Sequence, residues 1–86
     1  MPSKHEAIRN EAQDSFIQFL NVELKLGSTF VQSAVLAHGE DHEHAKDSAI
    51  LAAETVERFK SHIVKVKARN EIGRRLTSLK KMLATL

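Results

Sequence analysis

The chain has no cysteine, one proline and three glycines in 86 residues, and it contains neither tryptophan nor tyrosine. Without cysteine it has no disulfide framework, no thiolate zinc site and no cysteine nucleophile. Strand-rich and loop-rich folds need more turn residues than this. No apolar run approaches the ~18 residues of a membrane span, and the N-terminus lacks the apolar segment of a secretion signal. These absences predict a single all-α domain over residues 1–86, without a membrane span, in a reducing cytoplasm.

What the chain does have is a charge that changes sign along its length. Residues 1–57 hold four basic and ten acidic side chains, a net charge of −6. Residues 58–86 hold nine basic side chains and one acidic side chain, a net charge of +8. The change falls between Glu57 and Arg58, inside a predicted helix. We therefore expect the basic end to pair with the acidic end of the same chain or of another copy.

The apolar spacing predicts a long first helix that ends at Gly39, with His38 in its last turn. Ser3 and Glu6 fit a capping box at its start, while Asn10 and Asp14 are alternative caps for a later start. The apolar residues cover an arc of about 180°, so we expect this helix to pack against two others. They are Phe16, Ile17, Phe19, Leu20, Leu24, Leu26, Phe30, Val31, Ala34 and Val35.

Gly27 lies inside this predicted helix, where glycine costs about 1 kcal/mol relative to alanine. We therefore expect another backbone to approach closely at this position.

Two further helices follow in the prediction. Asp41 is the expected N-cap of the second helix, whose apolar face is lined by Ala45, Ala49, Ala52, Ala53, Val56, Phe59, Ile63 and Val66. The third carries Ile72, Leu76, Leu79, Leu83 and Leu86. The two stripes are out of phase, which predicts a break at residues 66–70 with Asn70 as the N-cap. Basic residues of the third helix would then face acids such as Glu11, Glu23 or Glu54 of an antiparallel three-helix bundle.

Residues 23–59 resemble a tetratricopeptide-type helical hairpin. The likeness rests on Leu26-Gly27 with Phe30, on Gly39 at the turn, and on small residues at Ala45, Ala49 and Ala52. With a third helix added, the chain is similar to the MIT domain, which binds short helical peptides in an interhelical groove. It departs from the repeat in the long stretch from Gly27 to Gly39 and in Glu23, which stands where a large apolar residue is usual. The resemblance implies an interaction module and carries over no site residue.

The densest group of candidate metal ligands lies at the predicted turn between the first two helices. His38, His42 and His44 alternate there with carboxylates, and imidazole with carboxylate suits zinc or nickel. The spacing does not match the zincin motif, because Lys46 stands where the second histidine would be. A polar interhelical turn, with acids complementing the dipole of the next helix, is the favoured reading, and a pH-sensitive turn is a third possibility.

The basic C-terminal segment supplies the candidate partner-binding residues, which are Arg69, Arg74, Arg75, Lys80 and Lys81. Their charges suit nucleic-acid phosphates, so a nucleic-acid accessory protein is the alternative function. Phe59 is the only aromatic nearby, however, and single-strand binders usually add stacking aromatics. Charge pairing with the acidic half, or with the helix dipole, is the favoured reading.

No motif fixes a reaction. The Ser, His and Asp residues suggest no triad, no glycine-rich phosphate loop is present, and no small-molecule substrate or cofactor is indicated. The sequence therefore predicts a non-enzymatic helical protein-interaction module that binds another protein or forms a homodimer. A homodimer would use apolar residues left uncovered by the third helix, such as Ile17 or Val35.

Overall fold

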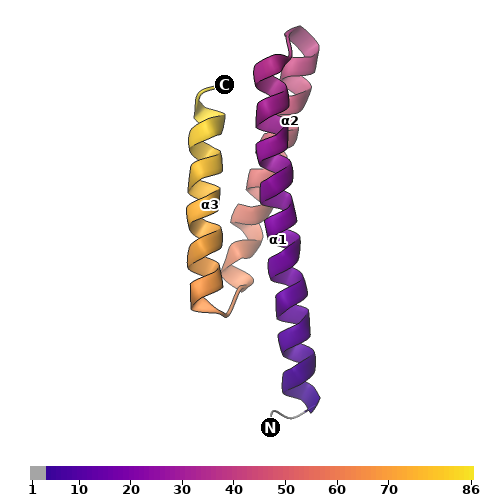
Figure 1. Ribbon diagram of the computed structural model, residues 1–86, viewed down its shortest axis with the longest axis vertical. Coiled ribbons are helices and arrows are strands. Elements are labelled where there is room, and N and C mark those ends of the chain that lie inside the picture. The colour runs from indigo at the N-terminus through magenta and orange to yellow at the C-terminus, as the bar shows by residue number, and fades with distance from the viewer. Residues whose placement is uncertain (1–3) are drawn as a thin grey trace.

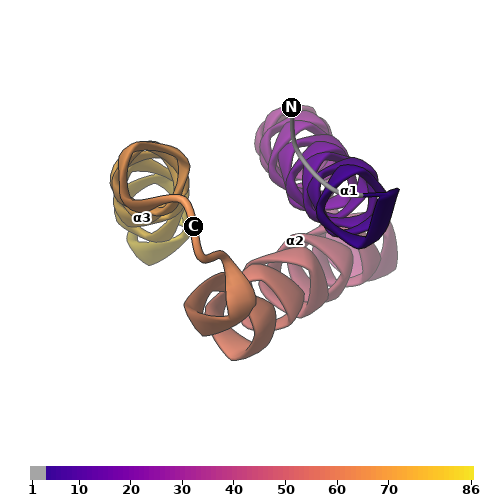
Figure 2. The ribbon, with the colours of Figure 1, turned by 90° about the horizontal axis from the view of Figure 1, so that it is seen from below.

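A computed structural model describes the backbone of residues 4–86 and the side chains of residues 11–86. It contains three α-helices, α1 (Lys4–Leu36), α2 (Gly39–Phe59) and α3 (Val66–Ala84), and a short 3-10 helix, η1 (Lys60–His62). No strand occurs within residues 4–86. The helices run up, down and up, and an end view places them at the corners of a triangle (Figures 1 and 2). The predicted all-α three-helix bundle with a long first helix is confirmed.

The core forms where α1 and α2 lie along one another and α3 closes one side. Its fully buried large side chains come from all three helices and the α2–α3 link: Leu20, Val56, Ile63, Ile72, Leu76 and Leu79. The wide apolar arc of α1 thus has the two helical neighbours that the sequence predicts. Within residues 4–86, no helix is long and apolar enough to cross a membrane.

Gly27 lies where α1 meets both α2 and α3. A Cβ atom placed there would lie 2.7 Å from Leu79 Cδ2 of α3 and 3.4 Å from Ala52 Cβ of α2. The predicted close approach of another backbone is not what these distances show, because the nearest atoms belong to side chains. The missing Cβ leaves room for the end of the Leu79 side chain, and the φ of Gly27 is not in the left-handed region.

The ends of α1 differ in part from the prediction. Because α1 already begins at Lys4, the later starts at Asn10 and Asp14 are wrong, and Ser3 lies outside the described residues. The helix ends at Leu36, so His38 is not in its last turn. Gly39 does adopt a left-handed φ of 61°, as expected for a glycine that reverses the chain.

The start of α2 also departs from the prediction. The N-cap position is His38, with extended backbone, and Asp41 lies in the first turn of the helix. There its negative charge complements the helix dipole without acting as a cap.

The break between α2 and α3 comes earlier than predicted. It was expected at residues 66–70, but α2 ends at Phe59 and α3 begins at Val66. The α-helix ends at Phe59, η1 tightens the chain, and Ile63 is extended and fully buried. Asn70 therefore lies inside α3 and caps nothing, and Val66 is exposed at the first position of α3 instead of extending the stripe of α2. Burying Ile63 through an extended link lets the chain turn without proline or glycine.

Candidate functional site

An apolar groove runs between α1 and α2 on the side that α3 leaves uncovered. We call it the α1–α2 groove, and its lining residues are Phe19, Glu23, Leu26, Phe30, Ser48, Leu51, Ala52 and Thr55. It has a volume of about 410 Å³. Phe19 remains 46% exposed, Leu26 42% and Leu51 64%. Large apolar side chains from two helices thus meet water along one continuous strip.

The same face carries carboxylates beside its apolar residues. Glu23 lines the groove one turn from both Phe19 and Leu26, and no lysine or arginine is among the lining residues. On α2, the exposed Asp47 lies one turn before Leu51, whereas Glu54 lines a separate hollow with Lys80 and Leu83 of α3. None of these three carboxylates forms an ion pair within residues 11–86. The groove is therefore apolar at its floor and negatively charged at its edges.

The basic partner-binding candidates do not share one surface. Arg75 donates a hydrogen bond to Asn21 of α1, and Lys80 pairs with Glu57 of α2 at 3.1 Å. Lys81 is exposed on α3 and pairs with no residue in the described part of the chain. Arg69 and Arg74 line an open cleft of about 810 Å³ between η1 and α3. The full lining of this η1–α3 cleft is Lys60, Ser61, Arg69, Asn70, Gly73, Arg74 and Thr77.

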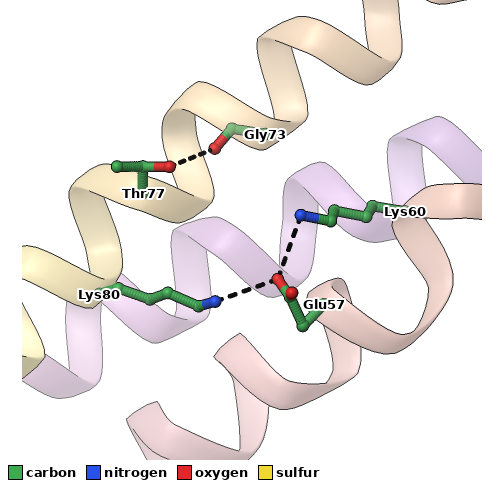
Figure 3. Close-up of polar contacts among 5 residues, drawn as sticks. All are labelled: Glu57, Lys60, Gly73, Thr77 and Lys80. Carbon is green, nitrogen blue, oxygen red and sulfur yellow. Dashed lines mark hydrogen bonds and ion pairs between the residues drawn. The ribbon is translucent and has the colours of Figure 1, made fainter.

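Glu57, near the end of α2, links this cleft to the rest of the bundle. Its carboxylate lies between the ammonium groups of Lys80, at 3.1 Å, and Lys60, at 3.3 Å (Figure 3). Hydrogen bonds from Lys80 and then Lys60 lower the pKa of Glu57 below its ordinary value. Across the cleft, the Thr77 hydroxyl donates to the Gly73 carbonyl of its own helix at 2.9 Å (Figure 3).

A second charged contact fixes the start of α3 against α1. Lys65 Nζ lies 2.6 Å from Asp14 Oδ1, and the next residue back, Val64, donates its backbone N–H to Gln13 Oε1. The basic half of the chain does pair with the acidic half, as expected. The acids that pair are Asp14 and Glu57, however, instead of the expected Glu11, Glu23 or Glu54, which form no ion pair within residues 11–86.

The histidines at the α1–α2 turn do not converge. The His42 ring donates from Nδ1 to the Ala34 carbonyl at 2.7 Å, in the last turn of α1, and this carbonyl also accepts from the Ala37 N–H at 3.3 Å. His44 lies 3.9 Å from Glu40, and both side chains are largely exposed. Among the residues that the structure describes, no three histidine, cysteine, aspartate or glutamate side chains are grouped to hold a metal ion. Within that part of the chain, His38, His42 and His44 form a polar turn.

The two residues that a homodimer was expected to use differ in exposure. Ile17 packs against the core, whereas Val35 is exposed close to the end of α1. Val35 lies with Val31, Leu36 and Met82 around a second apolar hollow, of about 510 Å³, between the C-terminal ends of α1 and α3.

A scan against protein-family models found no match, and searches of the curated proteins and of the solved structures found no significant match. The α1–α2 groove and the η1–α3 cleft must therefore be interpreted from their own chemistry.

Proposed function

We propose that this chain is a helical interaction module whose α1–α2 groove binds a basic amphipathic helix of another protein. One observation carries the proposal: α3 covers one side of the α1–α2 hairpin, and the apolar groove on the other side is open. Phe19 and Leu26 are seven residues apart, about 10 Å along the helix axis. A ligand helix with apolar residues at positions i, i+3 or i+4, and i+7 matches this spacing.

The charge around the groove selects the kind of helix. Glu23 and Asp47 have no basic partner within residues 11–86, so a ligand with lysine or arginine beside its apolar stripe gains their attraction. Each exposed pair of this kind contributes about 0–1 kcal/mol, whereas the apolar contacts provide most of the affinity. Charge therefore sets partner choice and orientation, and burial of Phe19, Leu26 and Leu51 sets strength.

A second copy of this chain fits the groove less well than a basic helix. Two copies joined by the same face would bring their unpaired carboxylates together, which opposes association. The outward face of α3 offers no large apolar side chain to fill the groove, because it carries Lys67, Asn70, Arg74, Thr77 and Lys81. The resemblance to helical hairpins supports an interaction role of this general kind.

Two designed peptides test the proposal. A peptide of about 18 residues with leucine on one helical face and lysine on the other has the required chemistry, and the same peptide with glutamate for lysine is its matched control. We expect saturable binding of the leucine–lysine peptide, measured by isothermal titration calorimetry. We expect much weaker binding of the leucine–glutamate peptide. Equal binding of both peptides, or of neither, would contradict the proposal.

Variants locate the contact. Leu51→Ser removes an exposed apolar side chain from the groove and should weaken the leucine–lysine peptide about tenfold. Val64→Ser is the matched control, because Val64 is 78% exposed and lies outside the groove. If both variants bind as tightly as the wild type, the peptide does not occupy the groove. A dimer in sedimentation equilibrium that Leu51→Ser dissociates would instead identify a second copy as the occupant.

A further inference from the structure

The η1–α3 cleft is a second surface, separate from the α1–α2 groove, and its lining points to an anion. Three of its seven lining residues are cationic, none is acidic, and Ser61 and Asn70 add neutral hydrogen-bond donors. Its volume of about 810 Å³ is within the range of small-molecule sites. No sequence motif for phosphate binding marks it, because its residues come from two elements that only the fold brings together.

We propose that this cleft binds a small soluble molecule that carries two or more linked phosphate groups. Arg69 and Arg74 lie five residues apart on α3, about 7.5 Å along the helix axis, and Lys60 faces them from η1. Cations distributed in this way suit neighbouring phosphates better than a single one. Guanidinium groups also bind phosphate oxygens through paired hydrogen bonds.

The arginines of the cleft are available for a ligand. Neither Arg69 nor Arg74 forms an ion pair or a side-chain hydrogen bond with any residue whose side chain the structure describes. Lys60 is held by Glu57, but Glu57 is shared with Lys80 (Figure 3). Lys60 can therefore turn toward a ligand while Lys80 still neutralises the carboxylate.

The wall of the cleft at Gly73 is open. A Cβ atom at this position would meet nothing within 4 Å, so glycine is not required there for packing. The space above Gly73 is part of the cleft and lies between the residues that would hold the phosphates. A larger side chain at this position would occupy that space without disturbing the core.

A compact ligand is favoured over a nucleic acid. An extended phosphate backbone needs a continuous basic face, but Lys65 is paired with Asp14 and Lys80 with Glu57. The cleft also contains no aromatic side chain on which a base could stack. What remains is a local group of cations around a cavity.

Calorimetry with tripolyphosphate in low-salt buffer tests this inference. We expect saturable binding by the wild-type chain, and a loss of about tenfold or more in the Arg69→Gln, Arg74→Gln double variant. The matched control is Lys67→Gln, Lys81→Gln, which removes the same charge from two α3 residues that do not line the cleft and should change affinity by about twofold or less. All four positions are exposed, and circular dichroism checks that each variant keeps its helices.

Two further variants separate shape from charge. Gly73→Leu adds a good helix former that fills the cleft, and we expect it to abolish binding while the protein stays folded. Glu57→Gln releases Lys60 and should tighten binding. Absence of saturable binding by the wild-type chain, equal losses in both double variants, or unchanged binding in Gly73→Leu would overturn the inference. Tighter binding of duplex DNA than of tripolyphosphate, with the Lys67 and Lys81 pair equally important, would overturn it in favour of nucleic acid.

Discussion

At the scale of single residues, Gly27 in α1 and Gly73 in α3 have opposite surroundings. Gly27 faces Leu79 and Ala52 of the two neighbouring helices, whereas Gly73 faces open space. Leu79 is almost completely buried, so its side chain has little room to move away from an added methyl group. One glycine is therefore required by packing, and the other only lowers helix propensity.

Alanine at each position should have effects of opposite sign. For Gly27→Ala, the clash with Leu79 costs about 1–3 kcal/mol, which outweighs the gain of about 1 kcal/mol in helix propensity. We expect a net loss in the free energy of unfolding. Gly73→Ala has no clash and should gain up to about 1 kcal/mol. Urea unfolding followed by circular dichroism compares the two, and a stabilising Gly27→Ala would show that the core around Leu79 is loosely packed.

Glu57 gives the stability a defined pH dependence. Its pKa is lower in the folded chain, because of the hydrogen bonds from Lys80 and Lys60. Its contribution to stability is therefore present above its unfolded pKa, about 4.3, and is lost as the pH falls through the lower folded value. The side chain is 47% exposed, so we expect the contribution to be below about 1 kcal/mol.

Glu57→Gln isolates this contribution. The difference in unfolding free energy between wild type and variant should be largest near neutral pH and should shrink as the pH falls below about 4. Urea unfolding at several pH values measures it. A difference that stays constant down to pH 2, below the ordinary carboxyl range, would show that the ion pairs with Lys80 and Lys60 do not form in solution.

At the scale of the helices, hydrophobic spacing predicted the number and type of elements, because amphipathic stripes follow directly from burial on one face. The spacing did not locate the break between α2 and α3 correctly, because no proline or glycine marks it. A weaker signal was present in Ile63, Val64 and Val66, three β-branched residues within four positions, which lower helix propensity. The caps near Gly39 were displaced by a few residues, since several neighbouring polar residues are good caps.

Ile63 is the anchor of the α2–α3 link. Because it is fully buried between the helices, Ile63→Ala should reduce the unfolding free energy by about 2–4 kcal/mol. Its neighbour Val64 is exposed, and Val64→Ala should change the stability by about 0.5 kcal/mol or less. Thermal unfolding compares the two. Equal effects would mean that the link is not packed as described.

The candidate surfaces were harder to predict than the helices. The apolar residues Phe19, Leu26 and Leu51 follow the same spacing as core residues, so the sequence could not show that α3 leaves them uncovered. The sequence identified the basic residues as candidates. It could not show which of them form ion pairs, as Lys80 does, and which line the cleft, as Arg69 and Arg74 do, because this depends on the position of η1. Both the α1–α2 groove and the η1–α3 cleft depend on the side of the α1–α2 hairpin against which α3 packs.

At the scale of the whole molecule, the charge split lies along an elongated body of 56 × 18 × 16 Å. The α1–α2 turn carries Glu40, Asp41, Glu43 and Asp47, whereas the α2–α3 link at the other end of α2 carries Arg58, Lys65, Lys67 and Arg69, with the N-terminal part of α1 extending beyond it (Figure 1). Among residues 11–86, only Asp14 and Glu57 of the acidic half pair with lysine side chains. Much of the charge separation is therefore left at the surface.

This separation should make self-association depend on salt. At low ionic strength we expect weak head-to-tail association, in which the basic end of one copy meets the acidic end of another. Salt screens such contacts, so sedimentation velocity should show monomers at physiological ionic strength. Association that persists or strengthens in high salt would instead indicate contact through the apolar groove.

The central claim is that the α1–α2 groove, left open by α3, is the surface that binds a partner helix. Titration of the ¹⁵N-labelled chain with the leucine–lysine peptide, followed by NMR, tests it most directly. We expect the largest chemical-shift changes at Phe19, Leu26 and Leu51 and their neighbours, with the outer face of α3 unchanged. Saturable binding with shifts concentrated on α3, or around Val35 and Met82 at the ends of α1 and α3, would contradict the claim.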